Sequence, residues 1–288
     1  MSRLLGILAV IILLFTMPTF AADMPQFSLG LGIDYVKGDF NTDFTSTCTT
    51  FPLIFDWIPN ERLNLELNVP FVKLSSGKTS NMATGSMASG SMAVSTGATD
   101  NAGTGAGGQG MMGGAGAGVI LSSGESQSGL GDITLTGAYN LVLDGDGSPN
   151  FAVTGYLKFP TADENKGLGT GAFDWGPGLS LSKRLGDWQP FSEARYVLQG
   201  GSSREEFGAR NYFLADVGLG YAWSENLSNS LFCRLGSSAF AGLAAPLEMR
   251  LKTVWGFREN TSVEFYLLKG LSNGSPDMGA GISFFVAF

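Results

Sequence analysis

Twelve segments of this chain alternate apolar and polar residues with a period of two, and this pattern limits the fold more than any other feature. Such alternation is typical of β-strands that have one apolar face. Each segment reaches about the 9–11 residues that a tilted strand needs to cross a bilayer. The segments are 26–37, 48–57, 62–74, 131–143, 150–160, 173–184, 188–199, 210–223, 227–237, 246–257, 261–270 and 278–288.

The apolar face carries almost no charge. Only Lys183 and Lys269 fall on the apolar faces of the twelve segments, and both lie near segment ends, where they can reach the membrane interface. A charge at the middle of a lipid-facing strand would cost about 2–4 kcal/mol. The alternation therefore fits a transmembrane antiparallel β-barrel of about 12 strands. A soluble β-sandwich shares the alternation, but its outward face would be polar.

Composition narrows the class further. Past residue 22 no apolar run has the length of a membrane helix, although 44% of the residues are hydrophobic. The 42 glycines and the 15% of charged residues argue against a helical enzyme domain. The net charge of −8 argues against nucleic acid as a partner. Because the chain has no histidine, every mechanism that needs a histidine base is excluded. We expect neither an enzyme nor a bound cofactor or metal.

Both ends indicate export to a bacterial outer membrane. Arg3, an apolar run over 4–15 and small residues up to Ala22 describe a secretory signal peptide over residues 1–22, and a retained anchor is the alternative. The mature domain is then 23–288. The final segment ends on Phe288, which resembles the C-terminal signal by which outer-membrane barrels are recognised for insertion. This resemblance implies outer-membrane lipids and the barrel-assembly machinery as partners.

The connections between segments alternate in length. Five are short, and the others include 38–47, 75–130, 161–172, 200–209, 238–245 and 271–277. Short periplasmic turns and longer external loops are typical of barrels. Four of the five tryptophans then fall beside the periplasmic turns and form one aromatic girdle, namely Trp57, Trp188, Trp223 and Trp255.

Charged residues occupy the predicted inner face. They are Asp34, Asp56, Glu66, Lys158, Glu193, Arg195, Asp216, Arg234, Glu248, Arg250, Lys252 and Glu264. Two interpretations stay open, a cross-strand network that stiffens the barrel and a wall that lines a conducting pathway. They are compatible, because a wet lumen relaxes the need of each charge for a partner.

Two hairpin turns predict a register. The turns 224–226 and 258–260 each end in asparagine, a residue that tolerates the left-handed conformation of a three-residue hairpin. Placing Trp223 opposite Leu227 puts Asp216 directly across from Arg234 inside the lumen, with their Cβ atoms about 4.5–5.5 Å apart.

Several smaller motifs favour structural interpretations. Residues 75–130 form a low-complexity external loop with a methionine-containing repeat at 82–96. The repeat has two interpretations: Cu(I) binding by its thioethers, or a flexible polar loop or partial plug.

The segment 144–147 is a turn rather than a calcium loop, since Gly155 stands where a glutamate is required. The glycines of 167–171 indicate a loop with tight turns, with a site at the channel mouth as the alternative. Cys48 and Cys233 are expected on separate strands, unpaired.

One part of the chain resembles a known family. The pieces Gly129-Leu130-Gly131-Asp132-Ile133, Lys158-Phe159-Pro160-Thr161-Ala162-Asp163, Gly167-Leu168-Gly169-Thr170-Gly171 and Leu181-Ser182-Lys183 resemble, in order and spacing, outer-membrane transporters labelled as belonging to the meta-pathway of phenol degradation. The resemblance implies a barrel that moves small compounds, hydrophobic or aromatic ones among them. It carries over no individual ligand-binding residue.

Twelve strands predict a narrow lumen, between the filled interior of eight strands and the aqueous channel of sixteen. We therefore expect an outer-membrane channel or transporter for passive passage of small-molecule solutes. The alternative is a closed structural or surface-interaction barrel without transport activity.

Overall fold

The structure is a computed structural model and describes residues 26–40, 45–76, 81–85, 117–121, 126–145, 147–200 and 208–288. The predicted signal peptide and most of the methionine-containing repeat lie outside these residues. Among the described residues the one helical element is a 3-10 turn, η1 (Glu164–Lys166), and no helix is long and apolar enough to cross a membrane.

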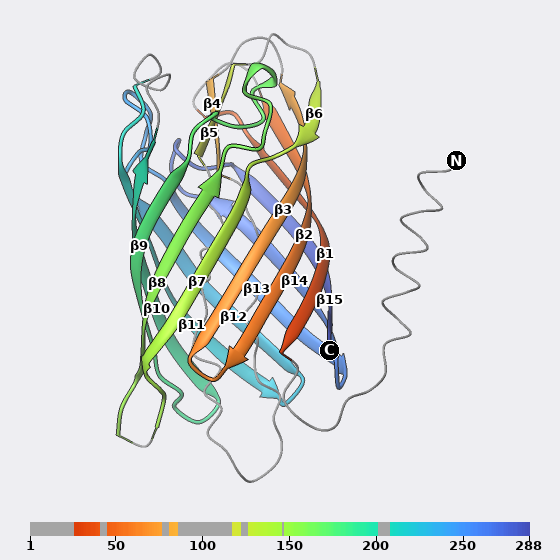
Figure 1. Cartoon of the computed structure of the whole chain (residues 1–288), viewed down its shortest axis with the longest axis vertical. Coiled ribbons are helices and arrows are strands. Elements are labelled where there is room, and N and C mark those ends of the chain that lie inside the picture. Colours follow the sequence, from red (N-terminus) through yellow and green to blue (C-terminus); the bar gives the residue numbers. More distant parts are fainter. Residues whose placement is uncertain are drawn as a thin grey trace, which may run out of the picture.

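The described strands close into an antiparallel β-barrel, as predicted (Figure 1). The sheet order is β2-β1-β15-β14-β13-β12-β11-β10-β9-β8-β7-β3-β6, and pairing of β2 with β3 closes the ring. Counting β6 and β7 as one interrupted strand gives the twelve strands that the alternation indicates. The strands are β1 (Phe27–Gly38), β2 (Ser46–Asn60), β3 (Leu63–Ser76), β6 (Gln127–Leu130), β7 (Ile133–Val142), β8 (Asn150–Phe159), β9 (Asp174–Ser182), β10 (Trp188–Gln199), β11 (Tyr212–Ser224), β12 (Leu227–Gly236), β13 (Leu247–Arg258), β14 (Thr261–Gly270) and β15 (Met278–Ala287).

The fourth predicted strand differs from the structure. Instead of one strand over 131–143, β6 and β7 both pair with β3 and are interrupted at Gly131 and Asp132. The register changes by one residue between Phe71–Leu130 and Asn68–Thr134. Pro70, at the interruption, has no amide hydrogen to donate to a ladder. A second difference is a separate two-stranded sheet of β4 (Asn81–Gly85) and β5 (Ala117–Leu121), within a segment predicted to be a loop.

The two faces of the barrel wall have opposite polarity. Large apolar side chains are exposed on the outer face along every long strand, and the polar and charged side chains of the inner face are buried. One outer row runs in register across four strands and consists of Leu219, Leu231, Leu251 and Leu267. A soluble sandwich would show the reverse polarity, so the structure favours a wall that faces lipid.

The two ends of the barrel differ as predicted. One end, called here the short-turn end, carries the connections 61–62, 143–149, 183–187, 225–226 and 259–260. The opposite end, the long-loop end, carries the longer connections, including 160–173, 200–211 and 237–246, and lies at the top of Figure 1. The four tryptophans of the predicted girdle lie near the short-turn end, all exposed. They join other aromatic rings there: Trp57 stacks on Phe27 at 6.2 Å between ring centroids.

The turn interpretation was wrong in its local detail, although the register it gave is right. Ser224, not Trp223, pairs with Leu227, because the register shifts near the turn and leaves the two-residue turn 225–226. The turn 259–260 is built in the same way. Neither asparagine is left-handed; among the described residues Phe40 is the one non-glycine residue with positive φ.

Three further predictions can be compared with the structure. Cys48, buried on β2, and Cys233, half-buried on β12, are free thiols, as predicted. Lys269 is exposed on the outer face near the end of β14. Lys183 is half-buried just beyond the end of β9, near the end of its segment as predicted, and donates to Asp144 Oδ1 at 2.8 Å. The carboxylate of Asp144 also accepts from the amide of Arg184, so Asp144 links the connections 143–149 and 183–187.

Candidate functional site

The candidate site is the inside of the barrel together with its long-loop end. All twelve charged residues singled out from the sequence lie on the inner face, and none is more than 7% exposed. They come from nine strands: Asp34 (β1), Asp56 (β2), Glu66 (β3), Lys158 (β8), Glu193 and Arg195 (β10), Asp216 (β11), Arg234 (β12), Glu248, Arg250 and Lys252 (β13) and Glu264 (β14).

Every one of the five inner cations forms an ion pair. The nitrogen–oxygen distances are 2.7 Å for Lys158–Asp174, 3.1 Å for Arg195–Glu193, 2.8 Å for Arg234–Asp216, 2.8 Å for Arg250–Glu248 and 2.8 Å for Lys252–Glu264. Burial makes such pairing necessary, because an unpaired charge out of water is costly. The guanidinium of Arg195 also lies 5.1 Å from the centre of the Tyr156 ring.

The predicted alignment of Asp216 with Arg234 is confirmed as direct cross-strand partners. The row continues on both sides, since Glu193 pairs with Asp216 and Glu248 pairs with Arg234. One arginine therefore stands in a row with three carboxylates across β10 to β13. The second half of the network follows the strands, because Arg195 binds Glu193 and Arg250 binds Glu248, two residues away along the same strand in each case.

The opposite arc of the wall is acidic. Asp34, Asp56 and Glu66 lie on the neighbouring strands β1, β2 and β3, and Asp56 is the direct cross-strand partner of Glu66. Ser28 donates to Asp56 Oδ2 at 2.6 Å. Counting all buried charged residues that are described gives eight carboxylates and five cations, so the inner wall has an excess of three acidic groups.

A third arc of the wall is lined mainly by uncharged polar side chains. Asparagine, threonine and serine side chains line the inner faces of β3, β7, β8 and β9. Several of their polar atoms, on Asn68, Thr154 and Ser180, are buried without a hydrogen-bond partner in the described protein. Buried polar groups normally have partners. This arc can therefore offer hydrogen bonds to water or to a polar part of a solute.

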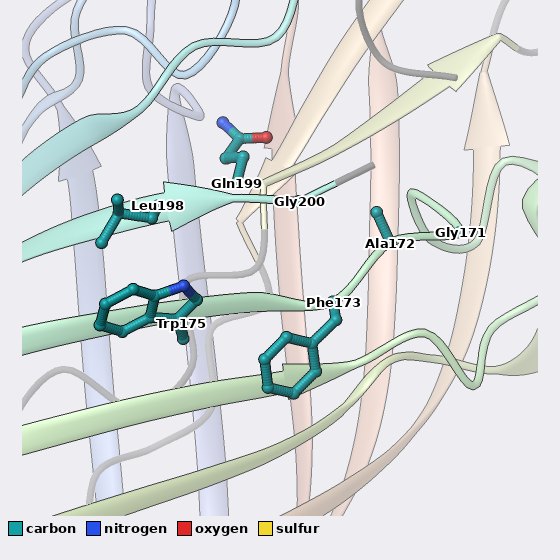
Figure 2. A pocket seen from close by; sticks show the side chains of 7 residues that line it. All are labelled: Gly171, Ala172, Phe173, Trp175, Leu198, Gln199 and Gly200. Carbon is teal, nitrogen blue, oxygen red and sulfur yellow. The ribbon is translucent and has the colours of Figure 1, made fainter. Parts of the chain in front are cut away.

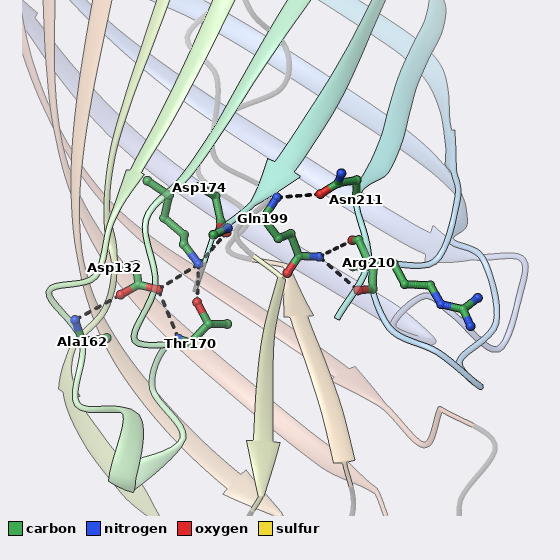
Figure 3. Close-up of polar contacts among 10 residues, drawn as sticks. Asp132, Ala162, Thr170, Asp174, Gln199, Arg210 and Asn211 are labelled. Carbon is green, nitrogen blue, oxygen red and sulfur yellow. Dashed lines mark hydrogen bonds and ion pairs between the residues drawn. The ribbon is translucent and has the colours of Figure 1, made fainter. Parts of the chain in front are cut away.

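Asp132 holds the connection between β8 and β9, residues 160–173, called here the mouth loop. Asp132 Oδ1 accepts from the amide of Ala162 at 3.1 Å and Oδ2 from the amide of Thr170 at 3.4 Å, so one carboxylate binds both legs of the loop (Figure 3). Lys158, fully buried, lies 3.4 Å from Asp132 and 2.7 Å from Asp174, and also binds Thr170. These contacts are called here the Asp132 clamp.

The sequence of the mouth loop explains its shape. Thr161 Oγ1 donates to the carbonyl of Gly131 and accepts from the amide of Ile133, so it bridges the interruption between β6 and β7. Asp163 caps η1 through the amide of Asn165. Gly167 and Gly171 have positive φ values of 66° and 64°, which other residues rarely adopt. The glycines of 167–171 are thus turn residues, as the sequence indicates.

A small pocket of about 400 Å³ lies beside the mouth loop, where β9 begins and β10 ends. Gly171, Ala172 and Phe173 contribute from the loop side, and Trp175, Leu198, Gln199 and Gly200 from the two strands (Figure 2). Gln199 is fixed by its contacts to Arg210 and Asn211, which are also drawn in Figure 3. The pocket touches one end of the segment 167–171, for which a site at the mouth is the alternative interpretation.

Sequence reasoning missed the residues that position the mouth loop. The sequence points to Asp132 and Thr170 only through the family resemblance, and it gives no sign of a role for Asp174. Asp132 lies where the strand is interrupted, so the alternation of apolar and polar residues gives no sign of its role. One signal in the sequence indicated that these segments act together: Gly131-Asp132 and the pieces within 160–171 resemble the family in the same order and spacing.

The fold resembles solved outer-membrane channels. The KdgM porin has a TM-score of 0.50 and 7% identity, with 91% of this chain and 99% of that chain covered. The KdgM porin in complex with disordered oligogalacturonate gives 0.49 and 8%, with 91% and 99% covered. The Ralstonia pickettii toluene transporter TbuX gives 0.43 and 11%, with 93% and 90% covered. Because the sequence identities are this low, the similarity to these structures shows the fold alone. A comparison with curated protein sequences gave no match.

A family model covers part of the strands and loops that build this site. It matches residues 58–232, which is more than half of the chain and includes the Asp132 clamp, the mouth loop, and Glu193 and Asp216 of the charged row. This chain belongs to the family described as "Putative MetA-pathway of phenol degradation".

Proposed function

We propose that this chain is an outer-membrane channel for the passive passage of small solutes, with lipid as its surrounding partner and the short-turn end in the periplasm. The observation that carries the proposal is the polarity of the closed wall: apolar side chains outside, and charged or hydrogen-bonding side chains inside. Only a membrane barrel with a polar interior needs this arrangement. Export through the predicted signal peptide and insertion by the barrel-assembly machinery belong to the same proposal.

Hydrophobic or aromatic compounds are candidates for the solutes, because the chain belongs to a family whose description names phenol degradation. The inner wall favours a second class, small polar solutes, through the asparagine, threonine and serine side chains of β3, β7, β8 and β9.

The test is reconstitution of the purified mature chain in planar bilayers and in liposomes. We expect single-channel conductance in the bilayers. In the liposomes we expect swelling with small sugar-like and aromatic solutes, and less swelling as solute size increases. The matched control is the same protein at equal concentration, unfolded by heat before reconstitution. The proposal is contradicted if the protein is folded in the membrane but shows no conductance and no flux for any solute.

A closed structural barrel is the second candidate. The observation that favours it is the low exposure of the inner side chains, since a wide aqueous channel would leave its wall side chains accessible. The same experiment separates the two functions. A closed barrel gives folded, membrane-inserted protein without conductance.

A further inference from the structure

The mouth loop contacts the apolar part of the inner wall through Leu168, and Ala162 of the same loop packs against the same residues. Leu168 is 7% exposed and belongs to one buried cluster with Val36, Cys48, Val72, Leu74 and Leu268. These partners are inner-face residues of β1, β2, β3 and β14, whereas the loop starts and ends at β8 and β9. We call this group the Leu168 cluster.

The wall part of the cluster is one row across the sheet. Leu268 pairs with Gly279, Gly279 with Val36, Val36 with Cys48, and Cys48 with Leu74. Five neighbouring strands, β14, β15, β1, β2 and β3, thus present a continuous apolar arc on the inner face of the barrel. An apolar arc on a water-facing wall is costly unless it is covered. Leu168 contributes to that cover.

The position of Leu168 is further fixed by its neighbours. A Cβ atom on Gly129 of β6 would lie 2.8 Å from Leu168 Cδ1, so β6 and the loop are in close contact. At the base of the loop the Asp132 clamp binds Ala162 and Thr170, which flank Leu168 on both sides. The loop is therefore held at its base by charged hydrogen bonds and at its tip by apolar contacts.

We propose that the mouth loop is the constriction that determines which solutes enter the lumen. Leu168 and the apolar arc form its contact surface, and Asp132 is the residue that positions it. A constriction with one apolar side admits small neutral solutes and disfavours larger hydrated ones, because a charge or polar group that passes it must give up water. This inference rests on the proposed channel function.

Cys48 provides a readout that does not require transport. It is a buried thiol in the Leu168 cluster, and Cys233, half-buried on β12, can be replaced by serine to leave a single reporter. The experiment measures the rate at which a charged maleimide labels Cys48 in the folded full chain in detergent. In the Cys233→Ser background we expect slow labelling.

Two substitutions should expose Cys48 by different routes. Asp132→Ala removes the acceptor for both legs of the loop, and Leu168→Ala removes the apolar tip. Labelling should accelerate at least about tenfold for Asp132→Ala, because a factor of ten corresponds to about 1.4 kcal/mol and hydrogen bonds to charged groups exceed this. Controls are Leu168→Met, which keeps an apolar side chain of similar volume, and Lys166→Ala, on the exposed side of the loop. Both should label like the parent.

The same variants are then measured for swelling with a size series of neutral solutes. Leu168→Ala should admit larger solutes than Leu168→Met. Unchanged labelling in both Asp132→Ala and Leu168→Ala overturns the constriction even if the parent conducts. Accelerated labelling without a change in the size limit overturns it as well. If neither the parent nor the variants show flux, the proposed channel function is overturned, and the constriction with it. A variant that fails to insert is identified by loss of heat-modifiable gel migration, and the other variant then decides.

Discussion

Asp216 and Arg234 form a two-pronged ion pair between β11 and β12 inside the barrel. Arg234 Nε lies 2.9 Å from Asp216 Oδ1, and Nη2 lies 2.8 Å from Oδ2. Both side chains are almost fully buried. The arginine also faces Glu248 in the ladder, and Asp216 faces Glu193. Arg234 is therefore the one cation in a row of four charged side chains.

Removal of Arg234 should destabilise the barrel strongly. Arg234→Ala leaves three carboxylates in a row, and we expect the free energy of unfolding to fall by about 3–5 kcal/mol, since a buried charge then lacks its partner. The double variant Asp216→Ala/Arg234→Ala should lose less than the sum of the single losses. The measurement is urea unfolding in liposomes, followed by tryptophan fluorescence. Additive losses would show that the pair is not coupled.

The lumen should prefer cations. Eight buried carboxylates against five cations leave an acidic excess, and Asp56 and Glu66 face each other on the acidic arc. The reversal potential in a potassium chloride gradient should show a higher permeability for potassium than for chloride. Asp56→Asn/Glu66→Gln should bring the permeability ratio towards one. The control is Glu259→Gln, in an exposed short turn, and an equal effect of the control would contradict a role for the acidic arc.

A charge on the outer face should cost stability where the wall meets the middle of the bilayer. Leu251 lies in the row of outer leucines on β13, and Leu251→Arg should lower the free energy of unfolding in liposomes by about 2–4 kcal/mol. Leu251→Val is the control for packing and should have a small effect. If arginine is tolerated as well as valine, the outer face does not contact the hydrocarbon core.

Gly281 on β15 should not tolerate a side chain. A Cβ atom there would overlap the carboxylate of Asp34 and the ring of Tyr266. Gly281→Ala should therefore lower the free energy of unfolding by about 1–3 kcal/mol, as overpacking does. Gly155→Ala on β8 is the matched control, because nothing lies within 4 Å of its added Cβ. Equal effects of the two substitutions would exclude the overlap as the cause.

The interior register followed from the sequence even where the turn did not. The turns 225–226 and 259–260 are shorter than expected and their asparagines are not left-handed, yet Asp216 still pairs with Arg234. A register shift at Trp223 compensates for the shorter turn. Backbone detail at a turn depends on which φ and ψ the closing strands allow, and alternation carries no information about it.

The sequence by itself determined the wall: which segments are strands, which side faces lipid, and twelve of the thirteen described charged residues that are buried inside. These properties follow from the period-two geometry of an extended strand between two different environments, and that geometry is local. The tertiary structure alone decided the interruption at Asp132, the partners of Lys158 and the seat of Leu168 against β1, β2, β3 and β14. Those contacts join residues up to 132 positions apart, such as Val36 and Leu168, and only closure of the barrel brings them together.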